Sequence, residues 1–292
     1  MGKTDKVQQV LERVGDLPAM PTVVSEVLRL TDDPSVTMAE VGQAIEKDPV
    51  LAARILKLSN SPYYGMRQFV GTLKLALVVL GVREVRNIIL GVSVIQSLCD
   101  DPSEAGLPKE FWVHCVVAAA LSRMLGAHLK LGLQGEAFVS GLLHDIGKLI
   151  LIRKLGVPYV EVYRQSGGIS DPLCEAELRY LGFTHADAAA ALASRWNFPA
   201  TLTDAISMHH ANDDVRLHLA KDPQLAAVIR LANLAAHHEF RDGGQEELAA
   251  CNGYQEAWQQ LESVREPVEP PARYEVLNTL QENIEQSPLP IF

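Results

Sequence analysis

The most informative stretch of the chain is Gly141-Leu142-Leu143-His144-Asp145-Ile146-Gly147-Lys148. The residues on both sides are mainly apolar, which predicts a buried helix through the whole segment. Burying an imidazole beside a carboxylate costs free energy unless a metal ion or a hydrogen-bonding partner compensates for it. His144 and Asp145 are therefore candidate site residues inside a helical core.

The rest of the chain also has helical periodicity. After Pro21, apolar residues recur at helical spacing, Thr37 and Glu40 form a capping-box pattern, and Asp48-Pro49 is typical of a helix start. No alternating strand pattern or hairpin signal is found. The fold class predicted is all-α, with further helices at residues 73–80, 82–98, 110–130, 184–196, 202–209 and 225–240.

Composition limits the function classes. Hydrophobic residues make up 48% of the 292 residues and aromatic residues only 6%, which favours packed helices. The net charge of −10 argues against broad binding to nucleic acids or anionic membranes. The four cysteines lack CxxC spacing, the N-terminus does not resemble a signal peptide, and no segment reaches the length and purity of a membrane span. We therefore expect a soluble, cytoplasmic protein.

Proline and glycine suggest how the chain is divided. Residues 100–109 contain two prolines and one glycine, which predicts a boundary between an N-terminal helical subdomain (1–105) and a second helical subdomain (106–265). Residues 266–292 are expected to form a Pro-rich arm. Within this arm, one set of residues has helical spacing and predicts a short helix: Tyr274, Leu277, Leu280 and Ile284.

Several short motifs follow one another in a characteristic order between residues 11 and 210. They lie at residues 17–21 (LPAMP), 48–56 (DPVLAARIL), 60–65 (NSPYYG), 76–81 (ALVVLG), 141–148 (GLLHDIGK), 196–199 (WNFP) and 209–210 (HH). Together they resemble the HDOD domain. This bacterial signalling module is related to the HD superfamily of metal-dependent phosphohydrolases, and the resemblance implies an all-helical bundle.

The resemblance also implies a set of metal ligands. The enzymatic HD pattern contains a His, then His-Asp, then a distant Asp, and members with two metals add a His and a His-His. The positions that match are His114, His144, Asp145, His185, His209 and His210, while Asn233 stands where the enzymes carry the last Asp. The glycine-tyrosine-proline signature of cyclic-di-GMP phosphodiesterases is absent after His210.

This ligand set is suited to one or two divalent transition metals (Fe, Mn, Ni or Zn), because Mg²⁺ and Ca²⁺ prefer oxygen ligands. Asp145 and Lys148 are the candidate catalytic residues. Asp145 would bridge two ions, and Lys148, about one helical turn beyond His144, would hold a phosphate.

Each histidine also has a structural explanation. His114 would be a satisfied core residue, and His185, which follows Thr184, would belong to a helix cap. His209 and His210 end an apolar helix, where the helix dipole favours an imidazolium without any metal.

Other residues have simpler explanations too. Lys148 would be solvated or ion-paired. Asp48-Pro49 and Asn60-Ser61 would form caps and turns, although the surface around residues 60–65 is also a candidate partner contact. Four histidines are expected on the surface or on the wrong helix face: His128, His218, His237 and His238.

The predicted function is a regulatory module that binds an unidentified signalling protein, with a nucleotide as the alternative ligand, and that partly retains a metal site. The alternative is a metal-dependent phosphohydrolase acting on a nucleotide or cyclic dinucleotide. In a third interpretation the metal only joins helices structurally.

Overall fold

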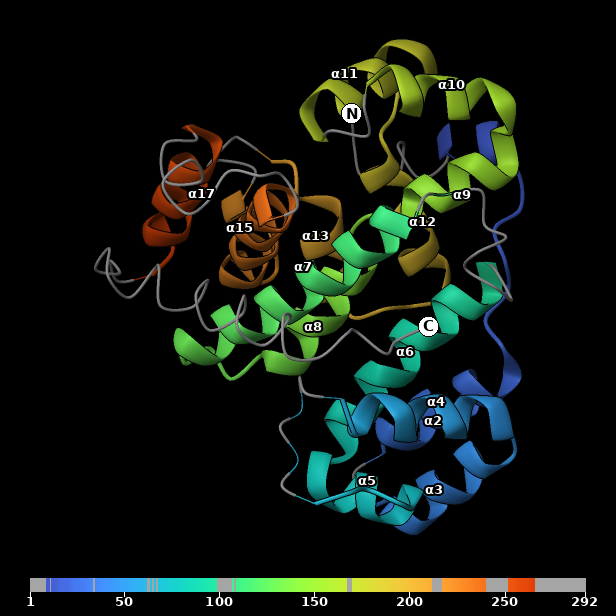
Figure 1. The fold of residues 1–292 in the computed structure, drawn as a ribbon. Helices are drawn as coiled ribbons and strands as arrows, with labels where there is room; N and C mark the ends of the chain where they lie inside the picture. Colours follow the sequence, from blue (N-terminus) through green and yellow to red (C-terminus); the bar gives the residue numbers. More distant parts are fainter. Residues whose placement is uncertain are drawn as a thin grey trace.

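A computed structural model of the chain describes residues 9–10, 12–33, 35–61, 64, 66, 68–98, 107, 109–166, 170–211, 217–239 and 252–265. Within these residues the secondary structure is helical and no strand occurs, which confirms the all-α class (Figure 1). The helices named below are α2 (Thr22–Thr31), α3 (Met38–Glu46), α4 (Pro49–Ser59), α5 (Leu73–Leu80), α6 (Val82–Leu98), α7 (Lys109–His128), α8 (Gln134–Leu143), α9 (Ile146–Leu155), α10 (Val157–Gln165), α11 (Ser170–Leu181), α12 (His185–Arg195), α13 (Ala200–Ser207), α15 (Pro223–Glu239) and α17 (Asn252–Ser263).

Local capping explains where the N-terminal helices begin. Thr37 and Glu40 form the predicted capping box of α3, and the Asp48 carboxylate accepts hydrogen bonds from the first turn of α4, with Pro49 as the first helical residue. Asn60 ends α4 and fixes the next loop, because its amide donates to the Val70 carbonyl at 2.9 Å and accepts from the Val70 N–H at 2.7 Å. The structural explanation of these residues is confirmed.

Helix α6 connects the N-terminal helices to the rest of the molecule. It packs against α2, α4 and α5 on one side and against α8 and α9 on the other. Two ion pairs reinforce the contact with α7 and α8: Arg123 lies 2.6 Å from Glu84, and Arg83 lies 2.5 Å from Glu136. Residues 99–106, where we placed the subdomain boundary, and the arm at 266–292 lie outside the described residues, so the predicted division stays a prediction.

The larger group of helices surrounds the Gly141–Lys148 segment. Helix α7 packs against α8 and α15, α9 packs against α12, and α13 contacts α8, α12 and α15. Two of the sequence motifs meet in this group, since the Trp196 indole N–H donates to the Pro18 carbonyl at 3.0 Å. The packing of this group therefore depends on residues far apart in the sequence.

One apolar helix differs from the expectation. By length and composition α7 could cross a membrane, although no such segment was predicted. In the fold, 72% of its apolar window is buried among other helices, as in a core helix of a soluble domain.

The structure corrects the helix predicted through the opening motif. Helix α8 ends at Leu143, His144 and Asp145 form a turn, and α9 begins at Ile146. Helices α10, α11 and α17 were not predicted at all.

Candidate metal centre

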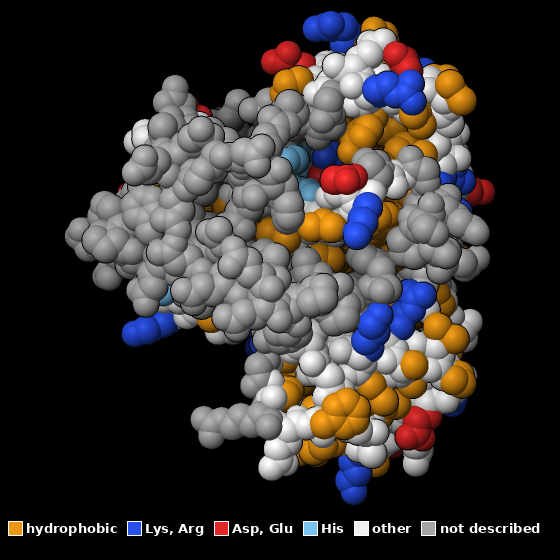
Figure 2. All heavy atoms as spheres, viewed as in Figure 1, with side chains coloured by type: hydrophobic (Ala, Val, Ile, Leu, Met, Phe, Trp, Pro, Cys, Tyr) orange, Lys and Arg blue, Asp and Glu red, His pale blue; other side chains and the backbone are white. Residues whose placement is uncertain are grey.

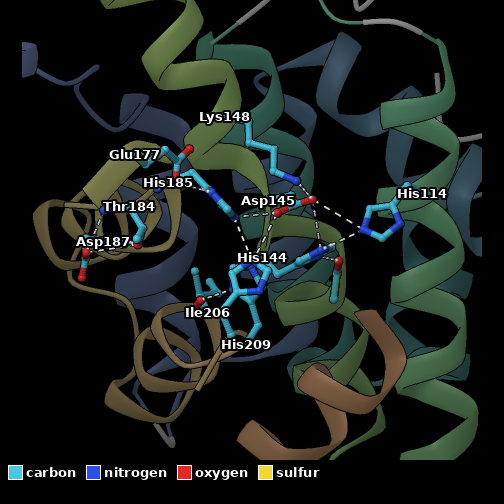
Figure 3. A network of polar contacts seen from close by, with 12 residues as sticks. His114, His144, Asp145, Lys148, Glu177, Thr184, His185, Asp187, Ile206 and His209 are labelled. Carbon is cyan, nitrogen blue, oxygen red and sulfur yellow. Dashed lines mark hydrogen bonds and ion pairs between the residues drawn. The ribbon is translucent and has the colours of Figure 1, made fainter. Parts of the chain in front are cut away.

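Asp145 is the centre of a buried polar cluster. It lies in the turn between α8 and α9, its side chain is 1% exposed, and imidazoles from three other parts of the fold face it (Figure 3). Its two carboxylate oxygens point toward different neighbours. The cluster therefore has two sides that share one carboxylate.

The Oδ2 side is formed by α7 and by the turn itself. Asp145 Oδ2 lies 3.5 Å from His114 Nε2, 3.4 Å from His144 Nε2 and 2.7 Å from Lys148 Nζ. The two imidazoles also approach each other, with 3.1 Å between their Nε2 atoms. On this side an ammonium group already neutralises the carboxylate.

The Oδ1 side is formed by α12 and by the turn after α13. Asp145 Oδ1 lies 3.1 Å from His185 Nε2 and 3.5 Å from His209 Nε2, and His210 Nε2 lies 3.0 Å from His185 Nε2. Despite these short distances, Asp145 Oδ1 and His209 Nε2 make no hydrogen bond among the described residues. His209 Nε2 thus faces a carboxylate oxygen whose ion-pair partner is His185 Nε2 at 3.1 Å, while His209 Nε2 itself has no hydrogen bond within the described ranges, which is costly in a protein interior.

Two close backbone contacts bring the cluster together. A Cβ at Gly147 would overlap the His185 carbonyl oxygen, so the glycine lets α9 approach the start of α12. A Cβ at Gly141 would lie 2.8 Å from the Ala118 carbonyl oxygen, so this glycine lets α8 approach α7. The spacing of the motif therefore places its glycines where backbones meet.

Burial and neighbouring charges set the protonation of the imidazoles. Burial lowers the pKa of His209 to about 4. Burial, followed by the neighbouring imidazoles His237 and His209, holds the pKa values of His114 and His210 well below the usual range. These groups are neutral at pH 7 and carry the lone pair that a metal requires. The imidazolium predicted for His209 and His210 is therefore wrong, because burial outweighs the helix dipole.

Asp145 and Lys148, the charged pair of the cluster, stabilise each other's ionised forms. Burial alone would raise the pKa of Asp145, but the Lys148 ammonium and then His144 hold it well below its usual value. Burial alone would lower the pKa of Lys148, and Asp145 raises it instead. Lys148 is 2% exposed, so the solvated interpretation is wrong and the ion-paired one is confirmed.

Asn233 is buried on α15, with 1% of its surface exposed. Neither its amide nitrogen nor its carbonyl oxygen has a hydrogen-bond partner among the described residues. Four residues further along α15, the His237 ring stacks on His114 with 4.1 Å between centroids. Because residues i and i+4 share a helix face, Asn233 lies on the face of α15 directed toward the Oδ2 side.

The position of His237 differs from the prediction, which was the surface or the wrong face of its helix. This side chain is half-buried against His114. The signal was available, because a residue four positions after a site residue on the same helix shares its face. His128 is exposed as expected, and the side chain of His238 lies outside the described residues.

Glu177 and Tyr159 were missed entirely. The Glu177 carboxylate is fully buried and accepts from His185 Nδ1 at 2.8 Å, from the His185 backbone N–H at 2.9 Å, and from the Tyr159 hydroxyl. Burial would lower the pKa of His185, but Glu177 and Asp145 raise it. No sequence motif marks either residue, and both lie on helices that were not predicted.

The donor set fits a divalent transition metal. The Oδ1 group contains Asp145, His185, His209 and His210, the Oδ2 group contains Asp145, His114 and His144, and the ligand atoms of each group lie within 4.8 Å of one another. Three imidazole nitrogens and one carboxylate oxygen suit Zn, Fe, Mn or Ni better than Mg or Ca. His210 and His237 are half-buried. In the view of Figure 2, histidine side chains are visible in a hollow of the surface.

Comparison with known proteins identifies the family of the chain. The family model of the HDOD domain matches residues 17–212. An uncharacterized protein from Treponema pallidum (strain Nichols) is 25% identical over 214 residues, which are 71% of this chain and only 40% of that protein. The chain thus spans less than half the length of this relative.

Two crystal structures share the fold. One, from Shewanella amazonensis SB2B, is of a protein provisionally named a phosphohydrolase; it is 24% identical, with a TM-score of 0.71 over 95% of this chain and 96% of that one. The other is an HDOD domain protein of unknown function from Geobacter sulfurreducens, 21% identical, with a TM-score of 0.69 over 98% and 99% of the two chains. At these identities the likeness shows the fold alone.

Proposed function

Because the chain belongs to the HDOD domain family, we propose that it is a regulatory module of bacterial signalling that binds a protein or small ligand and holds a divalent transition metal at Asp145. The observation that carries the proposal is the Oδ1 side of the cluster. There Asp145 Oδ1 and His209 Nε2 are buried, 3.5 Å apart and without hydrogen bonds among the described residues. A metal ion would satisfy both atoms at once.

We propose one tightly held ion rather than two. On the Oδ1 side, His185 and His210 add two more nitrogen ligands. On the Oδ2 side, Lys148 Nζ lies 2.7 Å from the carboxylate oxygen that an ion would need, and Asn233 stands in place of a carboxylate. A neutral amide oxygen is a weaker ligand for a divalent cation, so this side would bind metal poorly.

The difference between the ligands on the Oδ1 and Oδ2 sides supports a regulatory function rather than a catalytic one. Phosphoester hydrolysis with two metals requires both ions close together, one on each side of the attacking and leaving oxygens. A chain with Lys148 and Asn233 on one side lacks the charge to hold the second ion. The proposal includes a cytoplasmic location, a signalling protein as partner and a nucleotide as ligand. It does not include broad nucleic-acid binding or membrane binding.

The second candidate function is a metal-dependent phosphohydrolase acting on a nucleotide or cyclic dinucleotide. It is favoured by Asp145, whose two oxygens face two separate groups of imidazoles, as a bridging carboxylate would. A bound metal would supply Lewis acidity and lower the pKa of a water ligand. Lys148 would then orient a phosphate from its position beside Asp145.

Elemental analysis of protein purified without added metal tests the proposal. We expect about one transition-metal ion per chain, and no bound ion in Asp145→Ala. His128→Ala is the matched control, since it removes an exposed histidine from α7. A metal-free wild type that takes up no Zn²⁺ or Mn²⁺ on titration would refute the metal site.

Asn233→Asp separates the two candidate functions. In either case the added carboxylate should raise affinity for a second ion by about tenfold, or ~1.4 kcal/mol. Under the regulatory proposal, wild-type protein has no phosphodiesterase activity with Mn, Fe or Ni. Activity in the wild type that is lost in Asp145→Ala and raised in Asn233→Asp would establish the enzyme instead.

A further inference from the structure

Glu177 is a carboxylate buried on the far side of His185 from Asp145. It is 0% exposed, and His185 is its ion-pair partner in the part of the chain that the structure describes. Glu177 lies on α11, Tyr159 lies on α10, and His185 is the first residue of α12. Figure 3 shows Glu177 beside His185, on the side of the imidazole away from Asp145. The segment between Asp145 and His185 therefore contributes a carboxylate to the centre.

Three donors converge on this carboxylate. Glu177 Oε2 accepts from the His185 backbone N–H at 2.9 Å and from His185 Nδ1 at 2.8 Å, and Oε1 accepts from the Tyr159 hydroxyl. The backbone N–H belongs to the first turn of α12, where such groups lack partners within the helix and where the helix dipole favours an anion. Glu177 is thus held as a carboxylate that can only accept hydrogen bonds.

An acceptor-only group determines which nitrogen of His185 carries hydrogen. Nδ1 must donate to Glu177, which leaves Nε2 as the atom that faces Asp145 Oδ1 at 3.1 Å and His210 Nε2 at 3.0 Å. The ring is held at both Nδ1 and its own backbone by the same oxygen, so its orientation is fixed as well.

Two of the other histidines of the centre, His144 and His209, use a weaker form of the same arrangement. His144 Nδ1 lies 2.7 Å from the Gly141 carbonyl oxygen, and His209 Nδ1 lies 2.7 Å from the Ile206 carbonyl oxygen. In each case a fixed Nδ1 directs Nε2 toward Asp145. Of the described histidines around Asp145, His185 is the one with a carboxylate at Nδ1, and a carboxylate makes the imidazole a more basic ligand than a carbonyl does.

We infer that Glu177, supported by Tyr159, is a positioning residue that fixes the Nδ1–H form and the orientation of His185 and so presents Nε2 to the metal. The tautomer and orientation stand on the hydrogen bonds alone. The effect on metal affinity rests on the proposed function, so the two parts need separate measurements.

The first measurement needs no metal. In ¹⁵N-labelled wild-type protein treated with chelator, long-range ¹H–¹⁵N correlation spectra report which ring nitrogen of His185 is protonated. We expect Nδ1 to stay protonated between pH 7 and 9, with any proton loss at Nε2. An unprotonated Nδ1 would overturn the inference whether or not the protein binds metal.

The second measurement is Zn²⁺ titration by calorimetry. Glu177→Gln keeps an oxygen toward His185 and removes the charge, so we expect affinity to fall ten- to a hundredfold. Tyr159→Phe should cause a smaller loss in the same direction. Glu175→Gln, an exposed carboxylate on the same helix, is the matched control and should bind Zn²⁺ like the wild type.

The outcomes are distinguishable. Wild-type protein that binds no Zn²⁺ refutes the proposed metal site, and the tautomer measurement still tests Glu177. If the wild type binds Zn²⁺ and folded Glu177→Gln binds it equally well, the positioning role is wrong. Circular dichroism establishes that each variant is folded, and Tyr159→Phe provides the affinity test should Glu177→Gln not fold.

Discussion

His209 should make the metal-free protein less stable in mild acid. Its imidazole is fully buried and burial lowers its pKa to about 4, whereas an unfolded chain has the ordinary value of 6.5. As the pH falls below 6.5 the unfolded state takes up a proton that the folded state does not. Stability is therefore present above pH 6.5 and is lost as the pH falls toward 4.

The magnitude follows from these two pKa values. Between pH 7 and pH 5 the linkage relation gives a loss of about 2 kcal/mol from His209 alone. His114 and His210 act in the same direction because their pKa values are also lowered, and His185 acts in the opposite direction because its pKa is raised. The contribution of His209 must therefore be measured as a difference between proteins.

His209→Asn isolates that contribution. The asparagine amide nitrogen can still donate to the Ile206 carbonyl, as Nδ1 does at 2.7 Å, but it does not titrate. Urea unfolding followed by circular dichroism, with chelator present, gives the free energy of unfolding at pH 5, 6 and 7. We expect the wild type to lose about 2 kcal/mol more than the variant between pH 7 and 5, and His128→Asn to follow the wild type. Parallel curves for wild type and His209→Asn would show that the buried imidazole is not neutral.

Three other perturbations test the packing and charge of the centre. Asp145→Asn leaves the Lys148 ammonium buried without its counter-charge, so the free energy of unfolding should fall by about 3–5 kcal/mol. In the same urea assay, the double variant Asp145→Asn, Lys148→Met should recover most of that loss. Gly147→Ala should lower the free energy of unfolding by about 3 kcal/mol, because its methyl group would overlap the His185 carbonyl oxygen. The control Gly126→Ala, on α7, has room for a methyl group and should change the free energy of unfolding by less than about 1 kcal/mol. Equal effects of the two substitutions would contradict the packing described. Zn²⁺ binding should release a proton from His185, whose pKa is raised, so Zn²⁺ affinity should increase with pH. Calorimetry in buffers of different ionisation enthalpy measures the number of protons released. Binding without proton release would contradict this prediction.

Helix positions were predictable where a local signal marks the helix end. The capping residues Thr37 and Asp48 predicted the starts of α3 and α4, and both form the expected hydrogen bonds. The turn at His144-Asp145 was not predictable from periodicity, since apolar residues continue through it. Just after the turn, Gly147 closely approaches the His185 backbone on another helix, a tertiary contact that periodicity does not report.

Part of the candidate site was likewise predictable from the sequence, and part was not. The resemblance brought together histidines from four separate segments, and the structure places five of them around Asp145. It provided no indication of Glu177 or Tyr159, because a residue that supports a ligand has no fixed spacing from it. Positioning residues are set by the packing of helices, here α10 and α11 against the start of α12.

The balance of charge in this centre determines what metal binding would require. Two buried carboxylates, Asp145 and Glu177, are offset by the Lys148 ammonium and by His185, whose pKa is raised above its ordinary value. The positive and negative groups of the cluster are thus paired before any metal binds, which avoids the large cost of an unpaired buried charge. A divalent ion adds two positive charges to a balanced site, so its binding must expel a proton or displace Lys148. Under the proposed function, metal binding would therefore be coupled to a change in the protein's own groups, as a ligand-sensing module requires.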